Sequence, residues 1–585
     1  MNARPITLRS CRKTFTTDLD KARRPEETLA NFYNQIEKLP IKIVHEVRRI
    51  DNGRLGIPVY FSVCGDDAQA LTGTKKQMGK GASPVQAEAS ACMELAERFS
   101  LFSFRHQKEN FLVGDYESLK NYPLLPPEQL LKSVGDNQLT SEQLRELLAE
   151  IPLKWAWATE LSSGRAMLLP FSWFFAINEF NGSSAGNTLE EAALQAICEV
   201  VERHVSSVIS RGHLATPTID AKSLTDPVAQ DLLKKFANAG VDLKLYDFSL
   251  DTGVATVAAV GVDTTTFPIT SEIVYTAGTS PDPQKAAIRA ITEVAQLAGD
   301  FNTGANYVAS GLPKPASLAN LAYLGNQLEK SINDLPNLAD DDILVEIQRI
   351  LSALASIGLS VFLIDATHPQ LAIPAVYAII PGAHFRERAS QGEAGLFTAK
   401  LAMDLLGDDA SLDKKLTAME RLLPANAYLP FYRGQQAMKN GAPERAVACF
   451  IKALESSVTD EETATICSYA GSCLQEMGRN QEAIDMLKRG LEADEERPDI
   501  HNSLGVSWYK LGRYDQAIIS FGRAVELNPA SAIDYANLGI NHARLGQPQT
   551  AKDFLRLALT LDTTLDFARR ELAALENNPA NTIAS

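Results

Sequence analysis

Residues 84–98 read PVQAEASACMELAER and residues 189–203 read LEEAALQAICEVVER, and both stretches end in Glu-x-x-Glu-Arg. When the two are aligned on their glutamates, small residues also coincide, among them Ala87 with Ala192. Positions three or four residues apart share one side of an α-helix. The sequence therefore predicts two related helices, each with an acidic pair and an arginine on one face and small residues on another.

A third stretch, TSPDPQKAAIRAITEVAQL at residues 279–297, repeats the pattern more weakly. Asp282 takes the position before the helix, Glu293 matches the first glutamate, and Gln296 stands in place of the second. The arginine is absent from its former place, but Arg289 lies four residues before Glu293 and shares its helical face. We therefore expect three related helices.

The start of each helix carries residues that favour helix initiation. Ser83, Thr188 and Asp282 suit the N-cap position, and two of them are followed by a proline, which is favoured at the first helical position. Each helix then presents one polar stripe. The stripes are Ser90, Glu94 and Glu97 on the first, Glu191, Gln195, Glu199 and Glu202 on the second, and Arg289, Glu293 and Gln296 on the third.

A single Glu-Arg pair four residues apart is ordinarily a surface ion pair worth about 0.3–0.5 kcal/mol. Three aligned copies among apolar neighbours favour instead a partly buried site where the helices converge. Clustered carboxylates repel one another unless a cation intervenes, and hard oxygen ligands select Mg²⁺, which commonly bridges substrate phosphates. Arg98, Arg203 and Arg289 would then hold phosphate oxygens. The residues thus predict a site for Mg²⁺ and a nucleotide built from helices.

The familiar phosphate-binding loop is absent from the sequence. GTKKQMGKG, residues 73–81, has five residues rather than four between its glycines, and a glycine where Ser or Thr should follow the lysine. Its glycines and those of NGSSAGNT, residues 181–188, are better explained as tight turns into the capped helices. Exposed N–H groups at those helix starts would still favour an anion.

Composition limits the class of protein. A chain of 585 residues is too long for one core and predicts two or three domains. A net charge of −16 disfavours nucleic acid as a partner. No signal sequence and no run of about 18 apolar residues is present, so we expect a cytoplasmic protein without membrane contact. The seven cysteines show no zinc spacing and are expected to be buried thiols.

The sequence changes character near residue 390. Before it, β-branched runs alternate with helical patterns, which predicts an α/β or α+β domain over residues 1–390. After it, every segment is helical in pattern. We expect a helical connector at 391–425, a repeat domain with a capping helix at 426–577, and a polar tail at 578–585.

The repeat is visible in glycines 471, 505 and 539, which are 34 residues apart. This period and its small residues resemble the tetratricopeptide repeat, and we count about four copies. Such all-α solenoids bind peptides or proteins on a concave face. The alternative is an array that only supports packing or a homodimer.

The three helical stretches, in this order, resemble the YcaO family. The resemblance rests on GKGASPVQAEASACMELAER, NGSSAGNTLEEAALQAICEVVER and AAIRAITEVAQ, and it covers residues 15–390. Members of the family bind ATP between helices carrying these motifs, with Mg²⁺ held by glutamates. They use ATP to activate a peptide backbone amide oxygen, by phosphorylation in the favoured scheme. A Cys, Ser or Thr side chain or an external sulfur donor then attacks the amide carbon, giving azolines, thioamides or amidines.

The resemblance implies a role for each matching residue. The implied Mg²⁺ ligands are Glu94, Glu97, Glu199, Glu202 and Glu293. The implied nucleotide contacts are Ser184, Asn187, Glu191 and Gln195, and the implied phosphate contacts are Arg203 and Arg289. The polar neighbours added to the nucleotide-binding set are Ser90, Arg98, Glu293 and Gln296, with Arg98 orienting the glutamates beside it. Those expected to take part in catalysis are Glu199, Glu202 and Arg289.

Upstream, LDKARRPEETLANF at residues 19–32 resembles the family's opening helix. In that helix a lysine and, seven residues later, a hydroxyl residue approach the nucleoside, which implies Lys21 and Thr28 as nucleotide contacts. The alternative is a solvated helix start, with Pro25 at the first helical position.

Two functions follow from the resemblance. The first is ATP- and Mg²⁺-dependent activation of a peptide or protein backbone amide. The C-terminus ENNPANTIAS lacks the proline-rich end common in azoline-forming members, which counts against azoline formation specifically. The second is a non-catalytic nucleotide-binding adaptor or accessory factor, for example for β-methylthiolation of a ribosomal protein, with the repeats recruiting partners.

Overall fold

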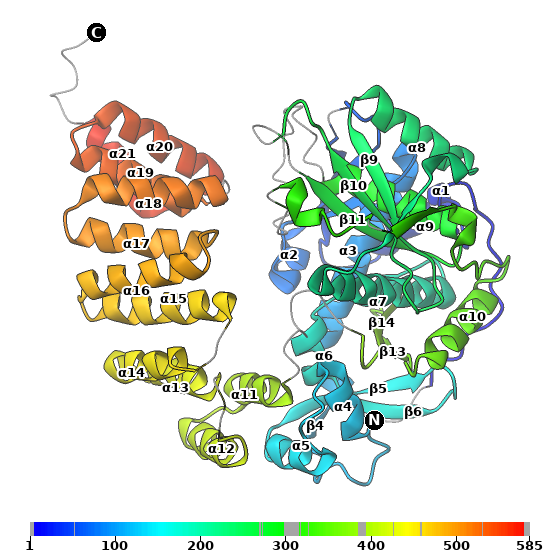
Figure 1. The fold of residues 1–585 in the computed structure, drawn as a ribbon, viewed down its shortest axis with the longest axis horizontal. Coiled ribbons are helices and arrows are strands. Elements are labelled where there is room, and N and C mark those ends of the chain that lie inside the picture. Colours follow the sequence, from blue (N-terminus) through cyan, green and yellow to red (C-terminus); the bar gives the residue numbers. More distant parts are fainter. Residues whose placement is uncertain are drawn as a thin grey trace. The chain divides into compact units, whose positions relative to one another are not determined.

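The computed structural model divides the chain into two compact units, residues 1–397 and 398–585. The residues it describes are 5–577 except for 52, 268–270, 272, 298–314, 316, 326, 384–392, 425, 427, 457–458 and 529–530. The predicted polar tail, 578–585, lies outside the described residues. Figure 1 shows the first unit as sheets covered by helices and the second as a stack of helices, which confirms the predicted fold class.

The first sheet has three antiparallel strands. Their order is β1 (Val44–Arg49), β2 (Val59–Cys64) and β3 (Lys76–Lys80). Helix α3 (Pro84–His106) packs on β2 and β3, and α1 (Pro25–Ile36) packs on α3. Helix α2 (Asp66–Thr72) lies between β2 and β3 in the chain. Apolar side chains of α3, including the fully buried Cys92 and Leu95, form the core beneath this sheet.

The second sheet has five strands and carries α9 on one face. Its order is β11 (Val274–Thr279), β10 (Thr256–Val262), β9 (Asp242–Asp247), β8 (Pro217–Ile219) and β12 (Gln327–Lys330). Neighbours are antiparallel except β8 and β12. Helices α9 (Pro283–Leu297) and α8 (Pro227–Asn238) pack together, and α9 covers β10 and β11. Every residue of β10 is buried, as its uninterrupted apolar run TVAAVGV requires.

The third sheet has six strands, all antiparallel to their neighbours. Its order is β4 (Leu112–Gly114), β5 (Leu153–Glu160), β13 (Phe362–Asp365), β14 (Ala375–Ile379) and β7 (Ser183–Ala185), with β6 (Ala166–Pro170) beside β5. Helix α7 (Leu189–Gly212) packs on β7 and β14. The remaining helices of this part are α4 (Pro127–Val134), α5 (Ser141–Leu148), α6 (Phe171–Asn178) and α10 (Ile343–Ser356), and α11 (Ala394–Leu405) spans the last residues of the first unit and the first residues of the second.

Each of the three predicted helices follows directly on a strand of a different sheet. β3 leads into α3, β7 into α7 and β11 into α9, through turns at residues 81–83, 186–188 and 280–282. The predicted caps are present at the last residue of each turn. The backbone N–H of Gln86 donates to Ser83, that of Glu191 to Thr188 and that of Gln284 to Asp282.

Two glycines allow these strands to lie directly on their helices. A Cβ atom at Gly79 would lie 2.0 Å from the backbone nitrogen of Ala91, and one at Gly278 would lie 2.5 Å from that of Ala290. Both distances are far shorter than van der Waals contact, so any side chain would push strand and helix apart. Alanines from the faces predicted to carry small residues, Ala91 and Ala290, lie in these two contacts.

The second unit consists of helices that pair along the chain. They are α12 (Asp409–Leu422), α13 (Tyr428–Lys439), α14 (Pro443–Leu454), α15 (Asp460–Glu476), α16 (Asn480–Ala493), α17 (Pro498–Lys510), α18 (Tyr514–Leu527), α19 (Ala532–Arg544), α20 (Pro548–Leu561) and α21 (Asp566–Glu576). The pairs α13/α14, α15/α16, α17/α18 and α19/α20 have the most extensive contacts, and α21 covers α20. Helices that pair in this way along the chain are typical of a repeat array.

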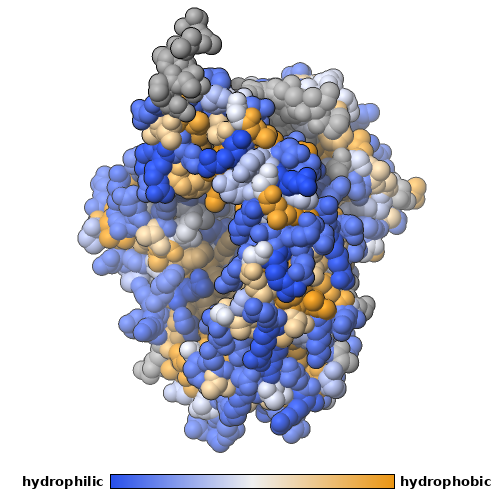
Figure 2. Space-filling model, turned by 90° about the vertical axis from the view of Figure 1, so that its left-hand side faces the viewer, coloured by the Kyte–Doolittle hydropathy of each residue, from blue (hydrophilic) through white to orange (hydrophobic). Residues whose placement is uncertain are grey.

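The surface seen in Figure 2 is mostly hydrophilic, with apolar side chains in small separate groups. Ile519 and Ile533 are examples of exposed apolar residues, at 64% and 50% exposure. Isolated apolar residues of this kind are ordinary on soluble surfaces. Among the described residues, no helix is both long and apolar enough to cross a membrane.

Candidate nucleotide and magnesium site

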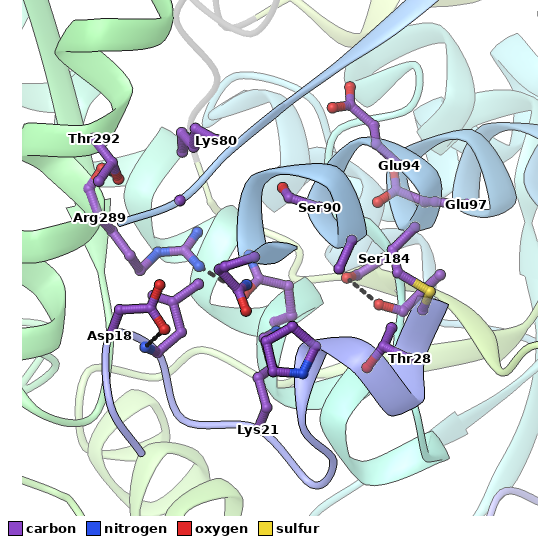
Figure 3. A pocket seen from close by; sticks show the side chains of 18 of the residues that line it. Asp18, Lys21, Thr28, Lys80, Ser90, Glu94, Glu97, Ser184, Arg289 and Thr292 are labelled. Atoms are coloured by element: carbon purple, nitrogen blue, oxygen red, sulfur yellow. Dashed lines mark hydrogen bonds between the residues drawn. The ribbon is translucent and has the colours of Figure 1, made fainter. Parts of the chain in front are cut away.

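Every site residue predicted from the sequence lines one pocket in the first unit (Figure 3). The set is Lys21, Thr28, Ser90, Glu94, Glu97, Arg98, Ser184, Asn187, Glu191, Gln195, Glu199, Glu202, Arg203, Arg289, Glu293 and Gln296. They come from the segment around the start of α1, from α3, from β7 and the turn after it, from α7, and from α9. The structure therefore brings together segments that are up to about half the chain apart.

The acidic end of the pocket is formed by α3 and α7. Burial raises the pKa of Glu97 to about 8, and the neighbouring carboxylates Glu199 and Glu94 add to the rise although Arg98 opposes it. Burial also raises the pKa values of Glu94 and Glu199. Glu202 is only 8% exposed and accepts a hydrogen bond of 3.1 Å from the backbone N–H of Thr279.

This donor set suits Mg²⁺. Raised pKa values at neighbouring carboxyl groups mean that their charged forms are destabilised, and a divalent cation would relieve that destabilisation. Within the described parts of the chain, no three His, Cys, Asp or Glu side chains already converge tightly enough to hold an ion by themselves. Mg²⁺ characteristically takes one or two carboxylates and completes its shell with water and substrate phosphate oxygens. The site fits that kind of binding rather than an all-protein cage.

Arg98 connects the acidic pair of α3 to the loop before β7. Its guanidinium lies 2.9 Å from Glu97 and 3.6 Å from Glu94, and it stacks 3.9 Å above the ring of Phe180. Ser183 donates a hydrogen bond of 2.6 Å to Glu97 and accepts one of 3.2 Å from Arg98. Arg98 thus has the contacts of a residue that orients its glutamates. Phe180 and Ser183 were not predicted as site residues, because neither belongs to a helical stripe.

The other end of the pocket is closed by the N-terminal segment. The backbone N–H of Ala22 donates to Glu191 at 2.8 Å, and the ammonium of Lys21 lies 3.6 Å from the same carboxylate. The Thr28 hydroxyl donates to the side-chain oxygen of Asn187 at 2.9 Å. Helix α1 begins at Pro25, as predicted, but Thr28 is only 6% exposed. The start of α1 is therefore a wall of the pocket and not a solvated helix end.

The start of α3, where an anion was expected, is occupied by a carboxylate of the chain itself. Asp18 is 2% exposed and accepts a hydrogen bond of 3.3 Å from the backbone N–H of Ala82. Burial raises its pKa. Lys285 holds the adjoining segment by donating to the backbone oxygens of Thr16 and Thr17. Asp18 was not predicted, since a single Asp in an irregular segment carries no periodic signal.

Helix α9 contributes the third polar stripe. Arg289 donates to the side-chain oxygen of Gln195 at 2.7 Å, and its Nε–H is buried without an acceptor among the residues that the structure describes. A buried donor of this kind is costly unless a ligand accepts from it. Glu293, one helical turn later, forms an ion pair with Lys80 at the end of β3.

Lys80 also lines the pocket, and it was not predicted to take part in binding or catalysis. Burial lowers its pKa to about 7, and the nearby Arg289 lowers it further while Glu202 and Glu94 oppose the change. The signal was present in the sequence, since Lys80 is the lysine of GTKKQMGKG. That stretch was considered only as a phosphate-binding loop, a motif that it does not fit.

Comparisons with known proteins match one family in each unit. A protein-family model described as YcaO cyclodehydratase, ATP- and Mg²⁺-binding, matches residues 78–384. A tetratricopeptide-repeat model matches residues 470–532. An uncharacterized protein of Methanothermobacter thermautotrophicus is 30% identical over 386 residues, which is 62% of this chain and 94% of that protein.

Two further proteins extend the comparison. The ribosomal protein S12 methylthiotransferase accessory factor YcaO of Escherichia coli is 28% identical over 249 residues, covering 38% of this chain and 40% of the relative. A solved structure of a heterocyclase in complex with substrate and cofactor superposes with a TM-score of 0.55 at 24% identity, covering 67% of this chain and 56% of the other. This likeness shows the fold of the first unit.

Proposed function

This chain belongs to the YcaO family, whose domain binds ATP and Mg²⁺, and we propose that it activates a backbone amide of a peptide or protein for attack by a nucleophile. The observation that carries the proposal is the pocket itself. Residues from separate segments place carboxylates, arginines and lysines around one cavity, and each predicted residue faces it. Such a concentration of opposite charges suits a polyphosphate with its metal ion better than a neutral ligand.

The carboxylates Glu94, Glu97, Glu199 and Glu202 would hold Mg²⁺, with Glu293 at the edge of the same cluster. Bound there, Mg²⁺ supplies positive charge that neutralises the phosphates of ATP and polarises the phosphoryl group that is transferred. The chain's own arginines do the remaining work. Arg203, 3.7 Å from Glu199, and Arg289, with its free Nε–H, would hold phosphate oxygens.

The poor leaving ability of an amide oxygen explains why ATP would be required. An amide oxygen is a very poor leaving group, whereas a phosphorylated oxygen leaves readily as phosphate. In the proposed reaction the amide oxygen takes the terminal phosphoryl group from ATP, ADP departs, and a nucleophile then attacks the amide carbon. The protein's part is to align the amide with the phosphate and to keep the arginines fixed, as in other phosphoryl transfers.

We further propose that the repeat unit binds a protein or peptide partner. Its helix pairs form an array of the kind that carries ligands on a continuous surface. Which modification follows activation would depend on the nucleophile, and the proposal covers azoline, thioamide and amidine products. An accessory role in protein modification is the second candidate, favoured by the match to the Escherichia coli accessory factor.

The first test is Mg²⁺-dependent ATP binding, measured by titration calorimetry with and without the metal. The wild type is expected to bind only when Mg²⁺ is present, and Glu202→Gln to bind at least about tenfold more weakly, since it removes a charged ligand without changing shape. Glu88→Gln is the matched control, because Glu88 is on α3 but contacts Tyr33 outside the pocket. A wild type that binds no ATP would refute the proposal.

Catalysis and an accessory role are separated by Glu199→Gln. The catalytic proposal requires that this variant fail to restore a strain lacking the gene, even when the folded protein is present at the wild-type level. Full restoration by Glu199→Gln would favour the adaptor.

A further inference from the structure

A second, smaller cavity adjoins the nucleotide pocket and has no part in the mechanism described above. Its volume is about 40 Å³. Lys21, Glu191, Gln195 and Arg289 are among the residues that line both spaces. Glu346, on α10, lines the smaller cavity but not the nucleotide pocket. Glu346 therefore faces residues of the nucleotide pocket across this cavity, without itself entering the pocket.

The two carboxylate oxygens of Glu346 have different surroundings. The side chain is 0% exposed. Its Oε1 accepts hydrogen bonds from the ammonium of Lys13 at 2.5 Å and from the backbone N–H of Asp340 at 3.2 Å. Its Oε2 is buried and has no hydrogen-bond partner within the described part of the chain. A buried carboxylate oxygen without a donor is costly, so a donor is expected beside it.

Arg289 carries donors of the kind that Glu346 lacks. It donates to the side-chain oxygen of Gln195 at 2.7 Å, and its Nε–H is buried without an acceptor among the residues that the structure describes. In Figure 3 the side chain extends from α9 into the nucleotide pocket. A guanidinium has more N–H donors than one phosphate accepts, so a bound phosphate would leave donors for the smaller cavity.

Water is the group that fits between Arg289 and Glu346. A cavity needs about 10–15 Å³ to hold one water molecule, which must also find polar partners there. The smaller cavity exceeds that volume, and both side chains line it. A water that accepts from Arg289 and donates to Oε2 of Glu346 would satisfy both groups. Such a bridge is nearly as favourable in enthalpy as a direct hydrogen bond.

We propose that Glu346 is a positioning residue of the nucleotide site, which holds Arg289 through a water molecule in the smaller cavity. The assignment rests on the proposed function. Because Lys13 and Asp340 fix Glu346, the water would keep the guanidinium in one orientation before the phosphates arrive. A side chain that is already oriented loses less conformational entropy on binding. Glu346 would therefore strengthen nucleotide binding without contacting the nucleotide.

The first test is a double-mutant cycle on ATP affinity, measured by titration calorimetry with Mg²⁺ at pH 8, above the pKa of Glu346. In Glu346→Gln the amide oxygen would accept from Lys13 and Asp340, which leaves an N–H₂ donor where Oε2 accepts. We expect ATP binding to weaken about fivefold in the wild-type background but less than about twofold beside Arg289→Lys, because lysine lacks the fork of donors. Equal weakening in both backgrounds would overturn the assignment.

The matched control for this cycle is Asp263→Asn. The Asp263 side chain is also 0% exposed and pairs with Arg54 at 2.7 Å, but it lines neither of the two cavities. This variant is expected to lose stability and, while folded, to keep the ATP affinity of the wild type. If Asp263→Asn weakened ATP binding as much as Glu346→Gln, the effect would belong to any lost buried ion pair, and the assignment would be wrong.

The second test is a crystal structure of the wild type without nucleotide. An ordered water is expected within hydrogen-bond distance of both Oε2 of Glu346 and the guanidinium of Arg289. A cavity without that water would overturn the assignment, even where Glu346→Gln does not fold. Failure of either test leaves the proposed function standing, whereas absence of ATP binding by the wild type would overturn both.

Discussion

The contacts that stabilise each unit of this chain join residues at very different separations along the sequence. In the first unit, the hydrogen bond from Ala22 to Glu191 joins residues 169 positions apart. In the second, the hydrogen bond from Gln475 to Ser507 joins residues 32 positions apart, one repeat away. Long-range contacts make a unit fold and fail as a whole, whereas neighbour contacts let an array absorb a local change. The same kind of substitution should therefore have unequal effects in the two units.

The largest effect is expected from Lys13→Met in the first unit. The ammonium of Lys13 lies 2.5 Å from Glu346 and 2.7 Å from Asp20, and the Glu346 side chain is 0% exposed. At pH 8, above the raised pKa of Glu346, removing one partner of this buried pair leaves the other charge unpaired, so the free energy of unfolding should fall by about 3–5 kcal/mol. Denaturant titration, with hydrogen exchange of peptides from each unit, measures it.

Its counterpart in the repeat unit is Arg433→Met. Arg433 is itself 12% exposed, but it pairs with Asp413 and Glu420, whose side chains are 57% and 44% exposed. Carboxylates this exposed regain water when the pair is broken, so the loss should be about 1 kcal/mol. Equal losses for Lys13→Met and Arg433→Met would show that the contrast between the units is wrong.

The next effect is expected from Gly79→Ala. The added Cβ would meet the backbone of α3 at 2.0 Å, which neither strand nor helix can avoid by rotating a side chain. We expect the first unit to lose about 3 kcal/mol and Mg²⁺-dependent ATP binding to weaken with it. Gly407→Ala is the control, since a Cβ there meets nothing within 4 Å. Unchanged stability of Gly79→Ala would mean that β3 does not pack on α3 in this way.

The units should also respond oppositely to pH. Burial raises the pKa of Glu346 from 4.5 to about 7, although Lys13 opposes the shift. Between those values the folded first unit keeps a proton that the unfolded chain has released. Its free energy of unfolding should therefore fall as pH rises from about 4.5 to about 7, by up to about 1 kcal/mol per pH unit.

In the repeat unit, the free energy of unfolding should change with pH in the opposite direction. Burial acts to raise the pKa of Asp499, but hydrogen bonds from Arg497 and Ser468 outweigh it and lower the pKa below 3.8. The stability that Asp499 contributes is present above that value and lost as the solution becomes more acidic. Unfolding curves at pH 2, 3, 4, 5, 6 and 7 measure both trends. Glu346→Gln should flatten the trend of the first unit, and an unaltered slope would contradict the assignment.

The smallest effect is expected from Gly522→Ala, and it should be a gain in the stability of the repeat unit. Gly522 lies within α18, and a Cβ there would meet nothing within 4 Å. Replacing a helical glycine by alanine should stabilise the repeat unit by about 0.5–1 kcal/mol. Thermal unfolding measures the change. A loss of stability would reveal a contact at this position and weaken the contrast with Gly79.

The helices of the site could be predicted because their signals are local. The glutamates of α3 and α7 repeat at helical spacing, and caps such as Ser83 lie next to the helices they begin. The three sheets could not be predicted, since strand order depends on pairings such as that of Leu363 on β13 with Thr159 on β5. Pairings of this kind leave no mark within either strand.

The pocket residues that were not predicted also lack a local signal in the sequence. Asp18 and Lys80 come from an irregular segment and from a strand end, where no period distinguishes a lining residue from a solvated one. The sixteen predicted residues share one pocket in the structure, and the binding measurements proposed above test their roles.

The three turns between strand and helix have the same length, although their side chains differ. Residues 81–83, 186–188 and 280–282 are three residues long in each case. A helix advances by about 100° per residue, so adding or removing one residue in such a turn would rotate the whole polar stripe by more than a quarter of a circle. Turn length therefore sets the phase of each helix, and with it the direction in which the carboxylates point. An insertion of a single small residue in one of these turns would point the carboxylates away from the pocket, although every charged residue would remain in the sequence.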